Sequence, residues 1–157
     1  MGVEVRGIEE VEKYFNDLDV KVQQKVLTEA VRAEARIFQA AIQEAAPVKI
    51  EPGGILPDGA LQADVIYRIG TDSSGRPAAV VGFGKLTRRV AGWVEYGHRL
   101  IRRHSKGLIR LKVKGGGSGL QVGTVQAHPF IRPAFEASVE AGNEAFAETF
   151  AEELKKR

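Results

Sequence analysis

Residues 20–46 constrain the fold more than any other stretch, because they are rich in Ala, Gln, Glu, Lys and Arg, which favour helix. Apolar residues recur there every three or four positions, which predicts an amphipathic helix about 40 Å long at 1.5 Å per residue. Pro47 ends the helix, since the residue before a proline is pushed out of the helical region. The expected buried face contains Val22, Val26, Ala30, Ala33, Ile37 and Ala41, widened by Leu27, Val31, Phe38 and Ile42.

Helix is also predicted before this stretch and at the C-terminus. Apolar residues at spacings of three and four predict a short helix over residues 8–18, so residues 8–46 form a helical N-terminal part. Asp17 and Asp19, which flank Leu18, are the candidate caps for the long helix. A last helix is predicted for residues 131–156, and Pro133 suits its first turn. Its expected buried face contains Phe135, Val139, Gly142, Phe146, Phe150 and Leu154, opposite an acidic side.

The segment between the two long helices predicts a small antiparallel sheet. Residues 47–60 hold three prolines and three glycines without a period, which is typical of a loop. Residues 61–70 and 78–84 then resemble two strands joined by a turn at residues 72–75. Periodicity does not decide whether residues 89–97 form a third strand or a short helix.

The central part of the chain is strongly basic. The net charge is +3, but residues 85–114 hold ten Lys or Arg and a single acid, whereas the remaining residues hold 13 basic and 19 acidic side chains. Residues 98–126 predict a basic hairpin arm with a flexible tip at residues 115–119 and a return strand after it. The candidate strand residues before the tip are Leu108, Ile109, Leu111 and Val113. The candidate partner-binding residues are Arg99, Arg102, Arg103, Lys106, Arg110, Lys112 and Lys114.

Such a segment is either a solvated loop or a contact for phosphates or for an acidic protein surface. Aromatic residues are absent from residues 98–114, so we expect any nucleic-acid contact there to reach phosphates without reading sequence.

The residues offer little for catalysis or for metal binding. The chain has no Cys, and its histidines are His98, His104 and His128, two of which lie in the basic stretch, where cation binding is disfavoured. Glu95 and His98 are a candidate acid–base pair, but no nucleophile motif, phosphate-binding loop or paired carboxylates accompany them. We therefore expect no catalytic residue, no metal and no cofactor.

Composition completes the fold prediction. Hydrophobic residues make up 43% and charged residues 27% of the 157 residues, as in an ordinary globular chain. We expect no signal peptide, because the first 15 residues carry acids and lack an apolar core. The prediction is a single α+β domain over residues 1–157. A small antiparallel sheet is flanked by the long N-terminal helix and the C-terminal helix, with an extended hairpin arm.

The stretch AHPFIRPAF, residues 127–135, predicts a sharp corner before the last helix. Pro129 ends the return strand, Phe130 and Ile131 enter the core, Arg132 points to a polar surrounding, and Pro133 starts the helix. We expect one cluster to fix this corner, and its members are Trp93, Tyr96, Phe130, Ile131 and Phe135.

Five short motifs occur in one order along residues 45–136. They are AAPV, GAL, VVGFG, GWVEYGH and AHPFIRPAFE. In this order the chain, from residue 20 to its end, resembles the small tail-completion and head–tail joining proteins of long-tailed bacteriophages and prophages, a family that includes minor tail and neck proteins. The matching motif residues are Trp93, Glu95, Tyr96, Gly97, Pro129, Phe130, Arg132, Pro133 and Phe135. The chain departs from the family in its long basic arm and after an enlarged loop, where the family's Thr-Gly before the Leu appears as Asp58-Gly59-Ala60-Leu61.

The resemblance implies a structural virion protein without enzymatic activity, made in the host cytoplasm and located at the neck. It implies helix for residues 89–97 and a ring, commonly of six copies, at the head-proximal end of the tail. The implied partners are other copies of the chain, the tail tube or terminator protein, and the head connector or stopper protein, with non-specific contact to passing DNA. We also expect no membrane contact, because no apolar run approaches the roughly 20 residues needed to span a bilayer.

Other functions stay open at this point. They are a tail terminator that controls tail length, a non-specific DNA-binding accessory protein, and a small hydrolase or nuclease that would use Glu95 and a histidine. We expect the arm, residues 99–114, to contact either an acidic neighbour or the DNA in the lumen.

Overall fold

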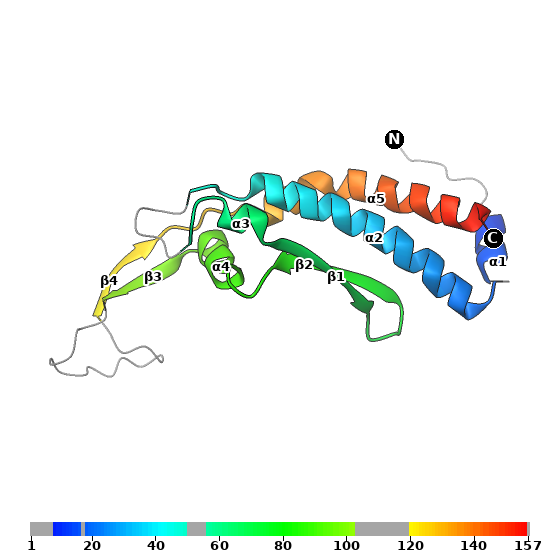
Figure 1. Cartoon of the computed structure of the whole chain (residues 1–157), viewed down its shortest axis with the longest axis horizontal. Coiled ribbons are helices and arrows are strands. Elements are labelled where there is room, and N and C mark those ends of the chain that lie inside the picture. The colour runs from blue at the N-terminus through cyan, green and yellow to red at the C-terminus, as the bar shows by residue number, and fades with distance from the viewer. Residues whose placement is uncertain (1–7, 17, 50–55, 103–119, 157) are drawn as a thin grey trace.

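The computed structural model describes residues 8–16, 18–49, 56–102 and 120–156, and its overall shape is elongated (Figure 1). Its elements in chain order are α1 (Ile8–Asn16), α2 (Val20–Ala45), α3 (Ala60–Ala63), β1 (Val65–Thr71), β2 (Pro77–Phe83), α4 (Arg88–Tyr96), β3 (His98–Arg102), β4 (Leu120–Val125) and α5 (Ile131–Lys155). The predicted α+β class is confirmed, with long helices near both ends of the chain and antiparallel strands between them.

Helix α2 lies between α5 and the sheet formed by β1 and β2, and it contacts both (Figure 1). Its first turn is capped by one of the two candidates, because the Asp19 carboxylate accepts a hydrogen bond of 2.8 Å from the backbone N of Lys21. A helix covered on two sides buries more than one stripe, so Ala35 is buried although the expected face omitted it. The buried residues of α2 are Val26, Ala30, Ala35, Phe38 and Ile42.

Small residues dominate the buried face of α5. Ala134, Ser138 and Gly142 are buried, and a Cβ atom added to Gly142 would lie 2.9 Å from Cζ of Phe38, which leaves no room for a larger side chain. The prediction that Phe135 belongs to the buried face is wrong, because this side chain is 45% exposed. Ala134, one residue earlier, takes the inward position.

Strands β1 and β2 pair antiparallel from Val65↔Phe83 to Thr71↔Pro77. At the turn the Asp72 carboxylate accepts hydrogen bonds from the backbone N atoms of Ser74 and Arg76 at 2.8 and 2.9 Å. The predicted start of the first strand at residue 61 is wrong, because residues 60–63 form the single turn α3 that buries Leu61 completely. A turn of four residues is too short to show a periodicity.

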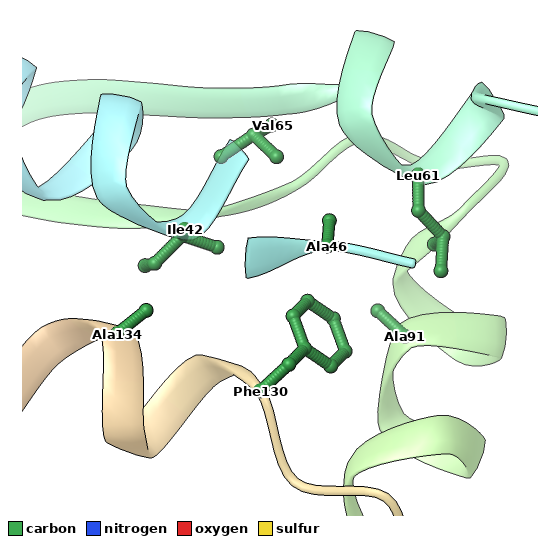
Figure 2. Close-up of a cluster of buried hydrophobic side chains, with 7 residues drawn as sticks. All are labelled: Ile42, Ala46, Leu61, Val65, Ala91, Phe130 and Ala134. Carbon is green, nitrogen blue, oxygen red and sulfur yellow. The ribbon is translucent and has the colours of Figure 1, made fainter. Parts of the chain in front are cut away.

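One cluster of buried side chains joins α2, α3, β1, α4 and α5 (Figure 2). The ring of Phe130, which is 4% exposed, points into the middle of this cluster, between Ala134 and Ala91 and below Ala46 in Figure 2. The cluster consists of Ile42, Ala46, Leu61, Val65, Ala91, Phe130 and Ala134. The expected entry of Phe130 into the core is confirmed.

The predicted arm begins as a hairpin at the end of the molecule opposite α1 (Figure 1). Strands β3 and β4 pair antiparallel from His98↔Val125 to Arg102↔Leu120, with a shift of register between Leu100 and Ile101. The expected strand residues Leu108, Ile109, Leu111 and Val113 and the tip at residues 115–119 lie outside the described residues.

Candidate functional site

The two most specific sequence motifs meet at a joint between α4 and the start of α5. The buried carboxylate of Glu95 accepts hydrogen bonds from the backbone N atoms of Phe130, Ile131 and Arg132 at 2.7, 2.9 and 3.2 Å. These N–H groups belong to the first turn of α5, where no intrahelical acceptor exists, and the residue that precedes the helix offers no side-chain cap. Glu95 therefore caps α5 from a different helix.

The electrostatics of this joint favour an ionised carboxylate. Burial raises the pKa of Glu95, but the three backbone N–H donors and the charge of Arg132 together bring the pKa below the ordinary value of a glutamate. The positive end of the helix dipole acts in the same direction. The N–H donors at the start of α5 thus stabilise the negative charge of Glu95, which becomes buried on folding.

Two further contacts hold the same motifs together. The backbone N of His128 donates a hydrogen bond of 2.7 Å to the carbonyl oxygen of Val94. Gly97 ends α4 with φ 71°, and a Cβ atom there would lie 2.6 Å from the carbonyl oxygen of Val125. Only glycine combines this positive φ with so close an approach of the neighbouring chain. GWVEYGH and AHPFIRPAFE are therefore parts of one structural unit.

The five residues expected to fix the corner, Trp93, Tyr96, Phe130, Ile131 and Phe135, differ widely in burial. Trp93, Tyr96 and Phe135 are 39%, 75% and 45% exposed, whereas Phe130 is buried and Ile131 packs against the core. Trp93 lies two positions from both buried residues of α4, which places it on the opposite side of a helix with 3.6 residues per turn. Its ring stacks on that of His98 at a centroid distance of 5.1 Å.

An open groove with a volume of about 610 Å³ runs beside this joint, between α2, β2 and the start of α5. The exposed Phe135 ring packs on the Phe38 ring at a centroid distance of 4.5 Å and forms part of the wall. Tyr96 lines the groove from α4, and burial raises the pKa of Glu34 at its rim. Tyr96 and Phe135, two of the three exposed motif aromatics, thus border a largely apolar depression.

The candidate residues of the basic arm are placed only in part. Arg99 is exposed on β3 and Arg102 belongs to the last position of that strand. Arg103, Lys106, Arg110, Lys112 and Lys114 lie outside the described residues, as does His104.

A second basic surface was not predicted from the sequence. Arg68, Lys85 and Arg88 line a shallow groove of about 410 Å³ on the outer face of the β1–β2 sheet. Lys85 and Arg88 belong to the basic sequence segment, but Arg68 precedes it and reaches the groove only because β1 pairs with β2. The sequence did contain a signal for this position, because Arg68 alternates with residues of β1 that face inward, and Arg68 must therefore lie on the outer face.

Glu95 and His98 do not form an acid–base pair in this arrangement. Both carboxylate oxygens of Glu95 are used by backbone donors, and Nδ1 of His98 is buried without a hydrogen-bond partner. Within the described ranges, no three His, Asp or Glu side chains gather as they would around a metal ion. No helix in that part of the chain has the length and apolar content to cross a membrane.

Comparisons of the chain with protein-family models, with curated proteins and with solved structures gave no match.

Proposed function

We propose that this chain is a structural protein of the bacteriophage neck. It forms a ring, commonly of six copies, at the head-proximal end of the tail, completes the tail and joins it to the head connector or stopper protein. In this role it needs no catalytic residue, metal or cofactor, and it is part of the virion.

The observation that carries the proposal is the joint between the two family-like motifs. GWVEYGH and AHPFIRPAFE are separated by 28 residues in the sequence, yet Glu95 of the first accepts three hydrogen bonds from the second. The resemblance therefore rests on residues that depend on one another physically. A chance occurrence of two short patterns would not require this dependence.

The exposed motif residues support a role in assembly. Trp93, Tyr96 and Phe135 add little to the core of the single chain, and large aromatic residues often dominate the energetics of protein interfaces. We assign this surface to a neighbouring neck protein of a different kind, the head connector or stopper protein.

The proposal is tested by electron microscopy of particles from a phage or induced prophage that lacks this gene. Filled heads beside separate tails of normal length are the expected result. Tails of irregular length would instead assign the chain as a tail terminator that controls length. Intact, infectious particles would overturn the structural role altogether.

Non-specific DNA binding is a second candidate, favoured by the cations in the groove on the sheet and by exposed Arg99. Such binding would weaken steeply with salt, because each neutralised phosphate releases counterions. Titration of the isolated protein with random duplex DNA at increasing salt tests it. Tight, salt-dependent binding would support this function, and binding absent even at low salt would exclude it.

A further inference from the structure

One face of the β1–β2 sheet is left uncovered by the described residues. Val65 is buried in the core and Tyr67 lies close to Arg36 of α2, so the intervening positions of β1 point away from α2. Arg68 on β1 and Val80 on β2 occupy this outer face, and Val80 is 73% exposed. A two-stranded sheet with one bare face is a weak structure by itself, and covering that face would stabilise it.

The bare face is positively charged. Arg68, Lys85 and Arg88 all line its shallow groove, and all three side chains are exposed. None of the three forms an ion pair with a described residue. The surface therefore combines an apolar floor with unpaired cations, and it fits a partner that presents carboxylates.

The same chain presents carboxylates in a regular row. Five glutamates lie four residues apart on α5, all exposed, and residues 133–154 contain no Lys or Arg. This glutamate stripe consists of Glu136, Glu140, Glu144, Glu148 and Glu152. Like charges four residues apart destabilise a helix by roughly 0.2–0.5 kcal/mol per pair, and a cationic partner would relieve that repulsion.

The stripe and the basic groove lie on opposite sides of the molecule. Each stripe position follows a buried-face position of α5, such as Ala134, Ser138 or Gly142, by two residues, which is about 200° around a helix of 3.6 residues per turn. The stripe therefore faces away from α2, whereas the groove lies on the far side of the sheet that α2 covers (Figure 1). A single chain cannot bring the two surfaces together.

We infer that the basic outer face of the β1–β2 sheet docks the glutamate stripe of α5 from a second copy of this chain. The inference rests on the proposed ring and names the surfaces that close it. The contact joins two different faces, so it is heterologous, and repetition of it gives a ring or a filament. Successive glutamates rise by about 6 Å along α5, so the stripe presents a row of carboxylates to the three cations of the groove.

Charge exchange tests the contact directly. In the groove variant, Arg68→Glu, Lys85→Glu and Arg88→Glu make both surfaces acidic; in the stripe variant, Glu140→Lys, Glu144→Lys and Glu148→Lys make both surfaces basic. Sedimentation of the full chain should show wild-type assemblies at low salt, and an association constant at least about a hundredfold lower for either variant alone. An equimolar mixture of the two variants should assemble again, because each offers the other a complementary face.

Matched controls carry the same charge changes elsewhere. Lys13→Glu, Lys21→Glu and Lys25→Glu should leave assembly intact, as should Glu9→Lys, Glu10→Lys and Glu12→Lys, since these exposed residues lie on α1 and at the start of α2. Circular dichroism checks that every variant is folded.

Three results would overturn the inference. One is a wild-type protein that stays monomeric. If that monomer binds duplex DNA through Arg68, Lys85 and Arg88, the groove is a phosphate-binding surface instead. Another is undiminished assembly of either folded variant. The last is a mixture that remains monomeric. None of these results would decide the neck role, which is tested by electron microscopy of particles that lack the gene. Conversely, intact particles in that experiment would exclude the neck role but would leave the result of the charge-exchange experiment unchanged.

Discussion

The joint between α4 and α5 and the surface beside it are built from the same two motifs. The side chains of the joint are buried and hydrogen-bonded, whereas the aromatic side chains beside it are exposed. In the joint, Glu95 meets three backbone donors and Phe130 fills the core. Beside it, Tyr96 is 75% exposed although it adjoins Glu95 in the sequence. One short motif therefore contains both a residue that fixes the fold and a residue that the fold leaves available. The predictions below separate these two classes, beginning with the largest effect on stability.

Phe130→Ala should have the largest effect on the joint. The ring is almost completely buried among side chains of five elements, so its removal leaves a cavity and should cost about 3–5 kcal/mol of unfolding free energy. Urea denaturation followed by circular dichroism measures the loss. Phe135→Ala, at the half-exposed ring, is the matched control and should cost clearly less. Equal losses for the two variants would contradict the distinction between joint and surface.

Glu95→Gln should follow in size. The variant keeps the shape of the side chain but removes the charge that three N–H groups stabilise, and it turns one acceptor into a donor that faces them. Hydrogen bonds to a charged group contribute about 1.5–3 kcal/mol, so we expect a loss of that order at pH 7. Exposed Glu44 gives the control substitution, Glu44→Gln, which should change stability little.

The same residue gives the joint a pH dependence. The pKa of Glu95 is lower in the folded than in the unfolded chain, so its contribution is fully present above the unfolded value of about 4.3. The contribution is lost as the pH falls from there through the folded pKa. Denaturation at a series of pH values should show wild type converging on Glu95→Gln in acid. A constant difference between the two across this range would argue against an ionised cap.

Gly97→Ala should cost about 1–3 kcal/mol, because a backbone at φ 71° and ψ 169° is essentially restricted to glycine, and the added Cβ atom would press on the carbonyl oxygen of Val125. Gly92, in the same motif, provides the contrast. It lies within α4 with open space at its Cβ position, so Gly92→Ala should be neutral or stabilising. Thermal unfolding of the two variants measures the difference in stability. Equal melting temperatures would contradict the close approach of the Val125 carbonyl oxygen to Gly97.

Tyr96→Ala should have the smallest effect on the fold, within about 0.5 kcal/mol, as expected for an exposed side chain away from caps and core. Urea denaturation measures it beside Phe130→Ala. A loss as large as that of Phe130→Ala would move Tyr96 into the joint.

Much of the fold follows from the sequence because its signals are local. The run of helix formers, Asp19 and Pro47 predict α2 almost to the residue, and alternation predicts β1 and β2. The one-turn helix α3 was missed because four residues carry no period. Periodicity also left α4 undecided between helix and strand, and the resemblance supplied the correct choice.

The site was harder to predict because it depends on contacts between distant residues. Nothing near Glu95 in the sequence indicates that its acceptors serve residues 130–132. Size guided the choice of Trp93, Tyr96 and Phe135 as residues that fix the corner, but these side chains are exposed, and the small residues Ala91 and Ala134 are buried beside Phe130. Close packing of helices selects small residues, and a pattern of hydrophobic residues alone does not reveal how closely the helices approach.

The central claim is that the joint serves folding while the exposed aromatics beside it serve assembly at the neck. The most direct test complements a phage that lacks this gene with wild type, with Tyr96→Ala or with the control Gly92→Ala, and counts joined particles by electron microscopy. The account predicts that Tyr96→Ala, although folded, leaves filled heads and tails apart, whereas Gly92→Ala joins them as wild type does. Normal numbers of joined, infectious particles with Tyr96→Ala would contradict it.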